Sequence, residues 1–240
     1  MTDLIFVPGL MCDASVWKTQ IDDLEGIASA RVALPGPRNS LGEMADALLA
    51  EAPPTFALVG HSMGGRVALE VMRRAAHRVQ GLALLDTGYR AIARGQAGER
   101  ERAGRFALLE MARAQGMRAM GRRWLEGMIH SDRHTDQDLV ERILDMIASQ
   151  PPELFEAQIQ ALLGRADATA ILINIGCPTL VLCGREDGWS PVSRHKEIAA
   201  LIDGSRLVIV PDCGHMSTLE RPAAISNALR DWLDSVRSAA

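Results

Sequence analysis

The sequence predicts an α/β fold in which a mostly parallel sheet of about six strands is flanked by helices and carries a helical insertion. Three observations lead to this prediction. Short apolar runs alternate with helical patterns, which is the order that builds a parallel sheet with right-handed crossovers. A long stretch with helical periodicity separates the earlier runs from the last two. The 240 residues, 48% of them hydrophobic, can bury one substantial core.

The predicted core comprises residues 1–90 and 166–240. Its first part has strands at residues 4–7, 30–34, 56–59 and 81–86, with a helix from near Leu41 and another after the third strand. Its second part has strands at residues 179–183 and 207–210, and a last helix from about residue 221 to 236. Strands of this length are far below the roughly 20 apolar residues that a membrane-spanning helix needs.

Residues 91–165 are predicted to form the helical insertion. Apolar residues recur there at three- and four-residue steps, with Gly116 and Gly121 as expected weak points in the first helical stretch. Thr135 is expected to cap a second helix, which ends at Pro151, and Pro152 starts a third. The apolar stripe of these helices predicts packing on the core, so we expect the insertion to form a lid.

The run Gly60-His61-Ser62-Met63-Gly64 lies between the strand at 56–59 and a helix. A strand that enters G-x-S-x-G and leaves as a helix is typical of a nucleophile elbow. The glycines are required because a Cβ two residues before or after the serine would collide with the neighbouring chain. The alternative is an ordinary strand-to-helix turn that happens to contain a serine.

Two further polar residues follow the last two strands. Gly184-Arg185-Glu186-Asp187 comes after the first of them, and Gly214-His215 comes after the second. The order Ser62, Asp187, His215 is that of the α/β-hydrolase triad. On these motifs the chain resembles the α/β-hydrolase superfamily, specifically its small single-domain esterases with a helical lid. The usual first two antiparallel strands of that fold are expected to be absent, because the sequence opens with the strand that precedes the oxyanion loop.

The resemblance implies a role for each residue of this set. Ser62 would be the nucleophile, His215 the general base and acid, and Asp187 the group that orients His215. The tetrahedral intermediate needs backbone donors, of which Met63, directly after the nucleophile, supplies one. By resemblance the other belongs to Leu10, in preference to Met11, although Pro8-Gly9 stands where the family commonly has His-Gly.

Other acidic and histidine side chains compete for these roles. Asp86 ends the strand at 81–86 and is the runner-up for the triad acid, while Glu186 is expected to point to solvent. Four further histidines lie in helical or loop contexts and are expected at the surface. They are His77, His130, His134 and His195.

The resulting functional hypothesis is a serine hydrolase that cleaves a carboxylic ester or a related small acyl compound through an acyl-enzyme on Ser62, without a cofactor or metal. The same triad also serves lactone, thioester and carbon–carbon bond hydrolysis in the superfamily, and some relatives are slow-turnover small-molecule receptors. A fold does not fix a function, so these alternatives stay open. Several large side chains near the cleft are candidates to line the substrate site: Trp17, Tyr89, Trp124, Trp189 and Met216.

Charge and cysteine content suggest the setting of the protein. The net charge of −4 gives no case for nucleic-acid binding. The cysteines show no C-x-x-C pair or zinc-ligand spacing, and the first residues lack the pattern of a signal peptide. We therefore expect a cytoplasmic monomer or homodimer without a membrane partner. Ten arginines lie between Arg90 and Arg133. Most are expected on solvated helix faces, but any that turn inward would favour a substrate with a carboxylate or phosphate.

Overall fold

A computed structural model describes residues 1–239 and contains, within them, a six-stranded sheet in which every neighbouring pair is parallel. The order across the sheet is β2-β1-β3-β4-β5-β6. The predicted α/β class and the number of strands are confirmed. The strands are β1 (Thr2–Val7), β2 (Ala28–Val32), β3 (Phe56–His61), β4 (Val79–Leu85), β5 (Thr179–Gly184) and β6 (Arg206–Val210).

The second strand differs from its predicted bounds. It was expected at 30–34 but runs from Ala28 to Val32, because its pairing partner β1 spans Thr2 to Val7 and the register joins Thr2 to Ala28. Leu34 has left the sheet and is 55% exposed. The extent of β2 is therefore set by its neighbour and not by its own apolar pattern.

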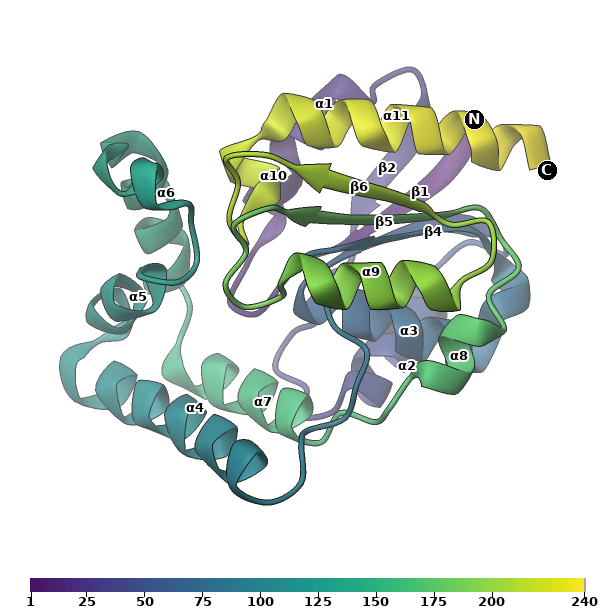
Figure 1. Ribbon diagram of the computed structural model, residues 1–240. Helices are drawn as coiled ribbons and strands as arrows, with labels where there is room; N and C mark the ends of the chain where they lie inside the picture. Colours follow the sequence, from purple (N-terminus) through teal and green to yellow (C-terminus); the bar gives the residue numbers. More distant parts are fainter. Residues whose placement is uncertain (240) are drawn as a thin grey trace.

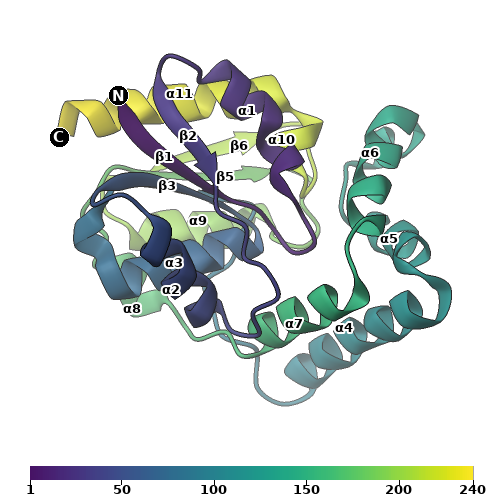
Figure 2. The ribbon, with the colours of Figure 1, turned by 180° about the vertical axis from the view of Figure 1, so that it is seen from behind.

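Helices cover both faces of the sheet (Figures 1 and 2). One face carries α1 (Lys18–Asp23) and α11 (Pro222–Ala239), and the other carries α2 (Leu41–Glu51), α3 (Met63–Ala75) and α9 (Val192–Leu201). The central strands β3, β4 and β5 are almost wholly buried, as expected for strands covered on both faces. Short helical elements complete this part: η1 (Ala14–Trp17), η2 (Ala76–Arg78), α8 (Thr169–Ile173) and α10 (Ser217–Glu220). No helix within residues 1–239 has the length and apolarity needed to cross a bilayer.

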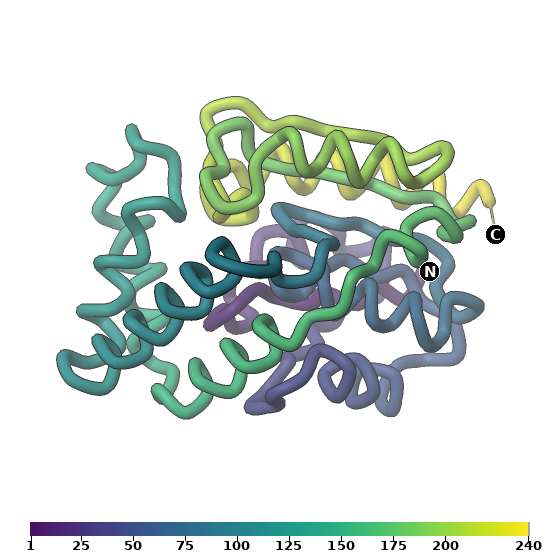
Figure 3. Tube along the Cα trace, turned by 60° about the horizontal axis from the view of Figure 1, so that its bottom comes forward, coloured from purple at the N-terminus to yellow at the C-terminus, as the bar shows by residue number. Residues whose placement is uncertain are grey.

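Between β4 and β5 the chain forms a group of helices that lies beyond the carboxyl ends of the strands (Figures 1 and 3). Gly116, with φ 91°, separates the first two of these helices. This agrees with the prediction that the helical stretch is weak at Gly116. We call this group the helical insertion. It consists of α4 (Gln96–Gln115), α5 (Met117–Leu125), η3 (Ser131–Thr135), α6 (Gln137–Ala148) and α7 (Pro152–Leu163).

Two local expectations for the insertion are wrong. Gly121 does not break a helix: it lies inside α5, where an added Cβ would come within 3.2 Å of Leu144 on α6, so glycine permits the close approach of these two helices. The N-cap of α6 is Asp136 and not Thr135. The Asp136 carboxylate accepts from the amide of Leu139 at 3.1 Å, whereas the Thr135 hydroxyl donates back to a carbonyl of η3.

Candidate active site

Ser62 occupies the tight turn between β3 and α3. Its backbone has φ 54° and ψ −114°, a conformation that costs a non-glycine residue free energy and persists only when the surroundings impose it. A Cβ at Gly60 would overlap the backbone of Gly64, and a Cβ at Gly64 would overlap the carbonyl of Val7 in β1. The two glycines therefore let β1, β3 and α3 converge, and the turn presents the Ser62 hydroxyl at the carboxyl edge of the sheet.

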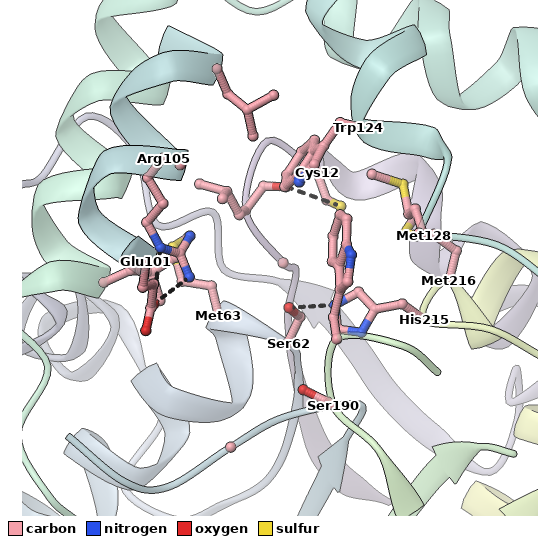
Figure 4. Close-up of a pocket in the computed structure, with 18 of the residues that line it drawn as sticks. Cys12, Ser62, Met63, Glu101, Arg105, Trp124, Met128, Ser190, His215 and Met216 are labelled. Carbon is pink, nitrogen blue, oxygen red and sulfur yellow. Dashed lines mark hydrogen bonds and ion pairs between the residues drawn. The ribbon is translucent and has the colours of Figure 1, made fainter. Parts of the chain in front are cut away.

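The structure brings His215 and Asp187 to this hydroxyl. His215 Nε2 lies 2.8 Å from Ser62 Oγ, and His215 Nδ1 lies 2.8 Å from Asp187 Oδ2 (Figure 4 shows the Ser62–His215 contact). The other carboxylate oxygen of Asp187 accepts from the amides of Trp189 and Ser190, both at 2.8 Å. The side chain of Asp187 is thus fixed from two directions, and the imidazole is held between a carboxylate and a hydroxyl.

The electrostatics of the pair favour a charged imidazole. Burial by itself would lower the pKa of His215, but the Asp187 carboxylate, together with further nearby carboxyl groups that include Glu220, outweighs it, and the pKa lies above the ordinary value of 6.5. Burial likewise opposes ionisation of Asp187, but the charge of His215 and the amide donors bring its pKa below the ordinary 3.8. An imidazole in this setting accepts a proton from a neighbouring hydroxyl more readily than a free one.

Asp86, the competing acid, does not reach the imidazole. Its carboxylate accepts from the amide of Gly184 at 2.9 Å and from the hydroxyl of Ser217. Burial, and then the charge of Asp187, raises the pKa of Asp86 well above the ordinary range. Asp86 thus ties the end of β4 to β5 and to α10. Glu186 is exposed as expected, although its carboxylate also accepts from the amide of Cys213 at 3.0 Å.

The loop after β1 supplies backbone amides beside Ser62. The amide of Met11 donates to the buried Oε1 of Gln158, on α7, at 2.9 Å. Within the described residues, the amides of Leu10 and Met63 have no hydrogen-bond partner, and both residues line the same cavity as Ser62. The side chain of Gln158 therefore accepts the hydrogen bond of the Met11 amide, while the amide of Leu10, one residue earlier, stays unpaired.

Sequence reasoning missed Glu220, which organises the loop that carries His215. Its carboxylate is 2% exposed and accepts from the amides of Gly214 at 3.1 Å, Met216 at 3.1 Å and His130 at 2.8 Å. The amide of His215 in turn donates to the carbonyl of Met128 at 2.8 Å. These bonds join the histidine loop to the helical insertion. A buried glutamate five residues after a histidine has no distinctive sequence pattern of its own.

The expected surface position of His195 is wrong. His195 is fully buried on α9, and its Nε2 accepts from the amide of Thr87 at 3.0 Å. Burial lowers the pKa of His195 to about 4, so the ring is neutral. His61, inside the elbow, is also buried, with its Nε2 2.8 Å from the carbonyl of His215, and burial lowers its pKa to about 4.

A cavity of about 790 Å³ opens at Ser62, between the sheet and the helical insertion (Figure 4). Trp124, Trp189 and Met216 line it, and the two indoles stack with ring centroids 5.0 Å apart. Trp17 and Tyr89 lie outside the lining. Trp17 stacks on Phe6 in the core at 4.6 Å, and the hydroxyl of Tyr89 donates to a glutamate of α9.

The four cysteines form no disulfide, and Cys12 lines the cavity. Burial raises the pKa of the Cys12 thiol to about 12, so it is not a thiolate. Burial also raises the pKa of the other three: Cys177, Cys183 and Cys213. These side chains pack as small apolar groups.

Comparison with known proteins identifies the family of the chain. The sequence model described as the alpha/beta hydrolase family matches residues 4–228. A pimeloyl-[acyl-carrier protein] methyl ester esterase of Nitrosospira multiformis is 28% identical, over 95% of this chain and 93% of that protein. The solved structure of a thermophilic esterase from Thermogutta terrifontis, with malate bound, has a TM-score of 0.87 at 28% identity and covers 98% of this chain and 90% of its own. An enol-lactonase from Burkholderia xenovorans shares the fold, with a TM-score of 0.82 at 23% identity over 98% of this chain and 92% of its own. The chain belongs to the α/β-hydrolase family.

Proposed function

We propose that this protein is a serine hydrolase that cleaves a carboxylic ester, or a related small acyl compound, through an acyl-enzyme on Ser62. The observation that carries the proposal is the continuous line of contacts from Ser62 Oγ to His215 and on to Asp187, each 2.8 Å long. Two relatives at 28% identity are esterases by name, which favours an ester over the other bonds that this fold cleaves.

The chemistry follows from the contacts at the imidazole. Ser62 Oγ attacks the carbonyl carbon while His215 Nε2 takes its proton, and Asp187 stabilises the imidazolium that forms. His215 then gives the proton to the leaving oxygen, and the alcohol departs. Water then attacks the acyl carbon and loses a proton to the same nitrogen. His215 returns that proton to Ser62 Oγ as the bond to the acyl group breaks and the acid leaves.

The negative oxygen of the tetrahedral intermediate would be bound by the unpaired amides of Leu10 and Met63. Their support is that Gln158 already occupies the amide of Met11, and that Met63 begins α3, where the helix dipole adds to the donor. Loss of one such donor costs about 3–4 kcal/mol of transition-state stabilisation in other serine hydrolases.

The test is hydrolysis of 4-nitrophenyl esters from acetate to decanoate by wild type and Ser62→Ala. We expect kcat/KM to fall by about 10⁴-fold or more in the variant, with its melting temperature kept. A fluorophosphonate should label the wild type once, on the peptide that contains Ser62. Turnover that survives in Ser62→Ala, or a label on another residue, would contradict the mechanism. A wild type that is inert on every ester would overturn the ester as substrate.

We further propose that the substrate is a small acyl compound, and that the protein works in the cytoplasm as a monomer or homodimer. The cavity volume suits a small molecule, and the four free thiols suit a reducing compartment. Size-exclusion chromatography with light scattering measures the oligomeric state.

A further inference from the structure

Four arginines from separate parts of the chain line one side of the cavity that holds Ser62. Arg66 comes from α3, Arg105 from α4 and Arg194 from α9, and Arg165 follows α7. We call these four residues the arginine cluster. Only Arg105 lies in the arginine-rich stretch noted in the sequence, so the cluster is assembled by the fold.

The arginine cluster is continuous. Arg66 Nη1 and Arg165 Nε both donate to the carbonyl oxygen of Arg90, at 3.0 and 3.3 Å, so their guanidinium groups lie beside each other. Arg165 also pairs with the Glu101 carboxylate at 2.7 Å, and Arg105 pairs with the same carboxylate at 3.0 Å (Figure 4 shows the Glu101–Arg105 pair).

Arg194 joins the cluster at the backbone of Gly88. An added Cβ on Gly88 would lie 2.7 Å from Arg66 Nη2 and 3.1 Å from Arg194 Cδ, which places these two side chains next to each other. Arg194 Nη1 donates to the carbonyl of Trp189 at 2.9 Å and to the hydroxyl of Ser190 at 3.3 Å. The cluster therefore reaches the loop that holds the triad acid.

The charges of the cluster are not balanced. Glu101 is the one carboxylate that its members contact within residues 1–239, and both of its oxygens bind Arg165 or Arg105. Burial, followed by the charges of Arg165 and Arg194, lowers the pKa of Arg66 to about 9. Burial opposes ionisation of Glu101, yet the two arginines bring its pKa to about 2. Four guanidinium groups thus face one carboxylate in a partly desolvated place, and an anion would relieve their repulsion.

The position of the cluster relates it to the reaction. Arg66 lies one helical turn after Ser62, and its amide contacts the Ser62 carbonyl at 3.4 Å. In the close-up, the Glu101–Arg105 pair lies on one side of Ser62, and Trp124 and Met128 lie on the other (Figure 4). The charged pair and the two apolar side chains thus lie on different sides of the serine.

We propose that the arginine cluster binds a carboxylate carried by the ester substrate, with Arg66 and Arg194 as its principal ligands. This inference rests on the proposed esterase function. Arg66 and Arg194 are chosen because neither contacts a carboxylate within the described residues, and the planar guanidinium fork matches a carboxylate. The substrate is then the monoester of a small dicarboxylic acid, or an ester of a hydroxy acid.

The experiment compares esters that differ only in charge. One pair is the 4-nitrophenyl monoester of glutaric acid and 4-nitrophenyl pentanoate, in which a methyl group replaces the carboxylate. A second pair, followed by pH-stat, puts the charge on the alcohol: the butyryl ester of glycolic acid against ethyl butyrate. We expect wild type to prefer the anionic member of at least one pair by about tenfold in kcat/KM, since a charge-assisted hydrogen bond contributes that much or more.

Arg66→Gln and Arg194→Gln are each expected to reduce this preference about tenfold, with melting temperatures measured for both. The matched control is Arg113→Gln on α4, whose guanidinium pairs with Glu110 and Glu156 at the surface and should leave the preference as it is. The inference is overturned if wild type has the same kcat/KM for the anionic and the neutral ester in both pairs. It is also overturned if the preference for the anionic ester is unchanged in both variants. In either case the esterase function stands.

Calorimetric binding of glutarate separates the two proposals. Wild type should bind glutarate at least tenfold more tightly than either variant, whether or not any ester is turned over. Glutarate binding that is equal in wild type and both variants would refute the anion site by itself. Inert protein that still binds glutarate through Arg66 and Arg194 would refute only the esterase function.

Discussion

Glu220→Gln tests how the histidine loop is held in place. The carboxylate of Glu220 accepts from three backbone amides, those of Gly214, Met216 and His130, and is 2% exposed. Glutamine is the same size, but its amide nitrogen is a donor. It therefore places a donor opposite a backbone N–H, which then has no acceptor.

The cost can be worked out from these contacts. A hydrogen bond to a charged group contributes about 1.5–3 kcal/mol, and a buried donor left unsatisfied costs about 1–3 kcal/mol. The two effects overlap, so we expect the free energy of unfolding to fall by roughly 2–4 kcal/mol. We also expect kcat to fall about tenfold or more, because a shift of the loop moves His215 Nε2 from its 2.8 Å contact with Ser62.

Charge gives this substitution a second readout. The negative charge of Glu220 is among the causes that raise the pKa of His215, so its removal should lower that pKa. The base must be neutral to act, and the acid limb of kcat/KM should therefore move to lower pH in Glu220→Gln. A residue that only supported the fold would leave the limb where it is.

The assay is urea unfolding together with pH profiles on a 4-nitrophenyl ester. Glu186→Gln is the matched control, because its exposed carboxylate accepts from the single amide of Cys213 in the same loop. It should change the unfolding free energy by less than about 1 kcal/mol. Glu220→Gln that matches Glu186→Gln in stability, kcat and pH profile would refute the reasoning.

Two further predictions concern titratable groups. Since Asp187 raises the pKa of His215, wild-type kcat/KM should be lost as pH falls through a value above 6.5. Asp187→Asn should shift that limb downward and reduce kcat by about 10⁴-fold, as in other serine hydrolases; an unshifted limb would exclude His215 as the titrating base. His195 and His61 each have a pKa near 4 in the folded protein and near 6.5 in the unfolded chain. As pH falls from 6.5 to about 4, the unfolded chain binds protons that the folded protein does not, so the free energy of unfolding should decline. The loss approaches roughly 3 kcal/mol for each histidine. His195→Gln should flatten this decline in unfolding experiments, and an equal slope would show that His195 is not its source.

The sequence by itself determined the features that depend on local chain geometry. Only glycine fits at positions 60 and 64, because the turn at Ser62 brings three backbone segments together. The G-x-S-x-G motif shows this requirement in the sequence. The alternation of apolar runs with helical patterns determined the parallel sheet for a similar reason, since the connection between two parallel strands needs a helix. The order of the polar residues after the strands then followed from the topology.

Tertiary structure decided which groups face one another. Asp86 and Asp187 follow neighbouring strands, and only the folded loops show that Ser217 and Gly184 occupy Asp86 while Asp187 reaches His215. Glu220 and the arginine cluster were hidden for the same reason. Arg66 lies far along the chain from Arg165, as Glu220 does from the amide of His130, and a periodic pattern records which residues are apolar but not which distant groups meet. Buried charge is satisfied by specific partners in three dimensions, and those partners have no fixed spacing in the sequence.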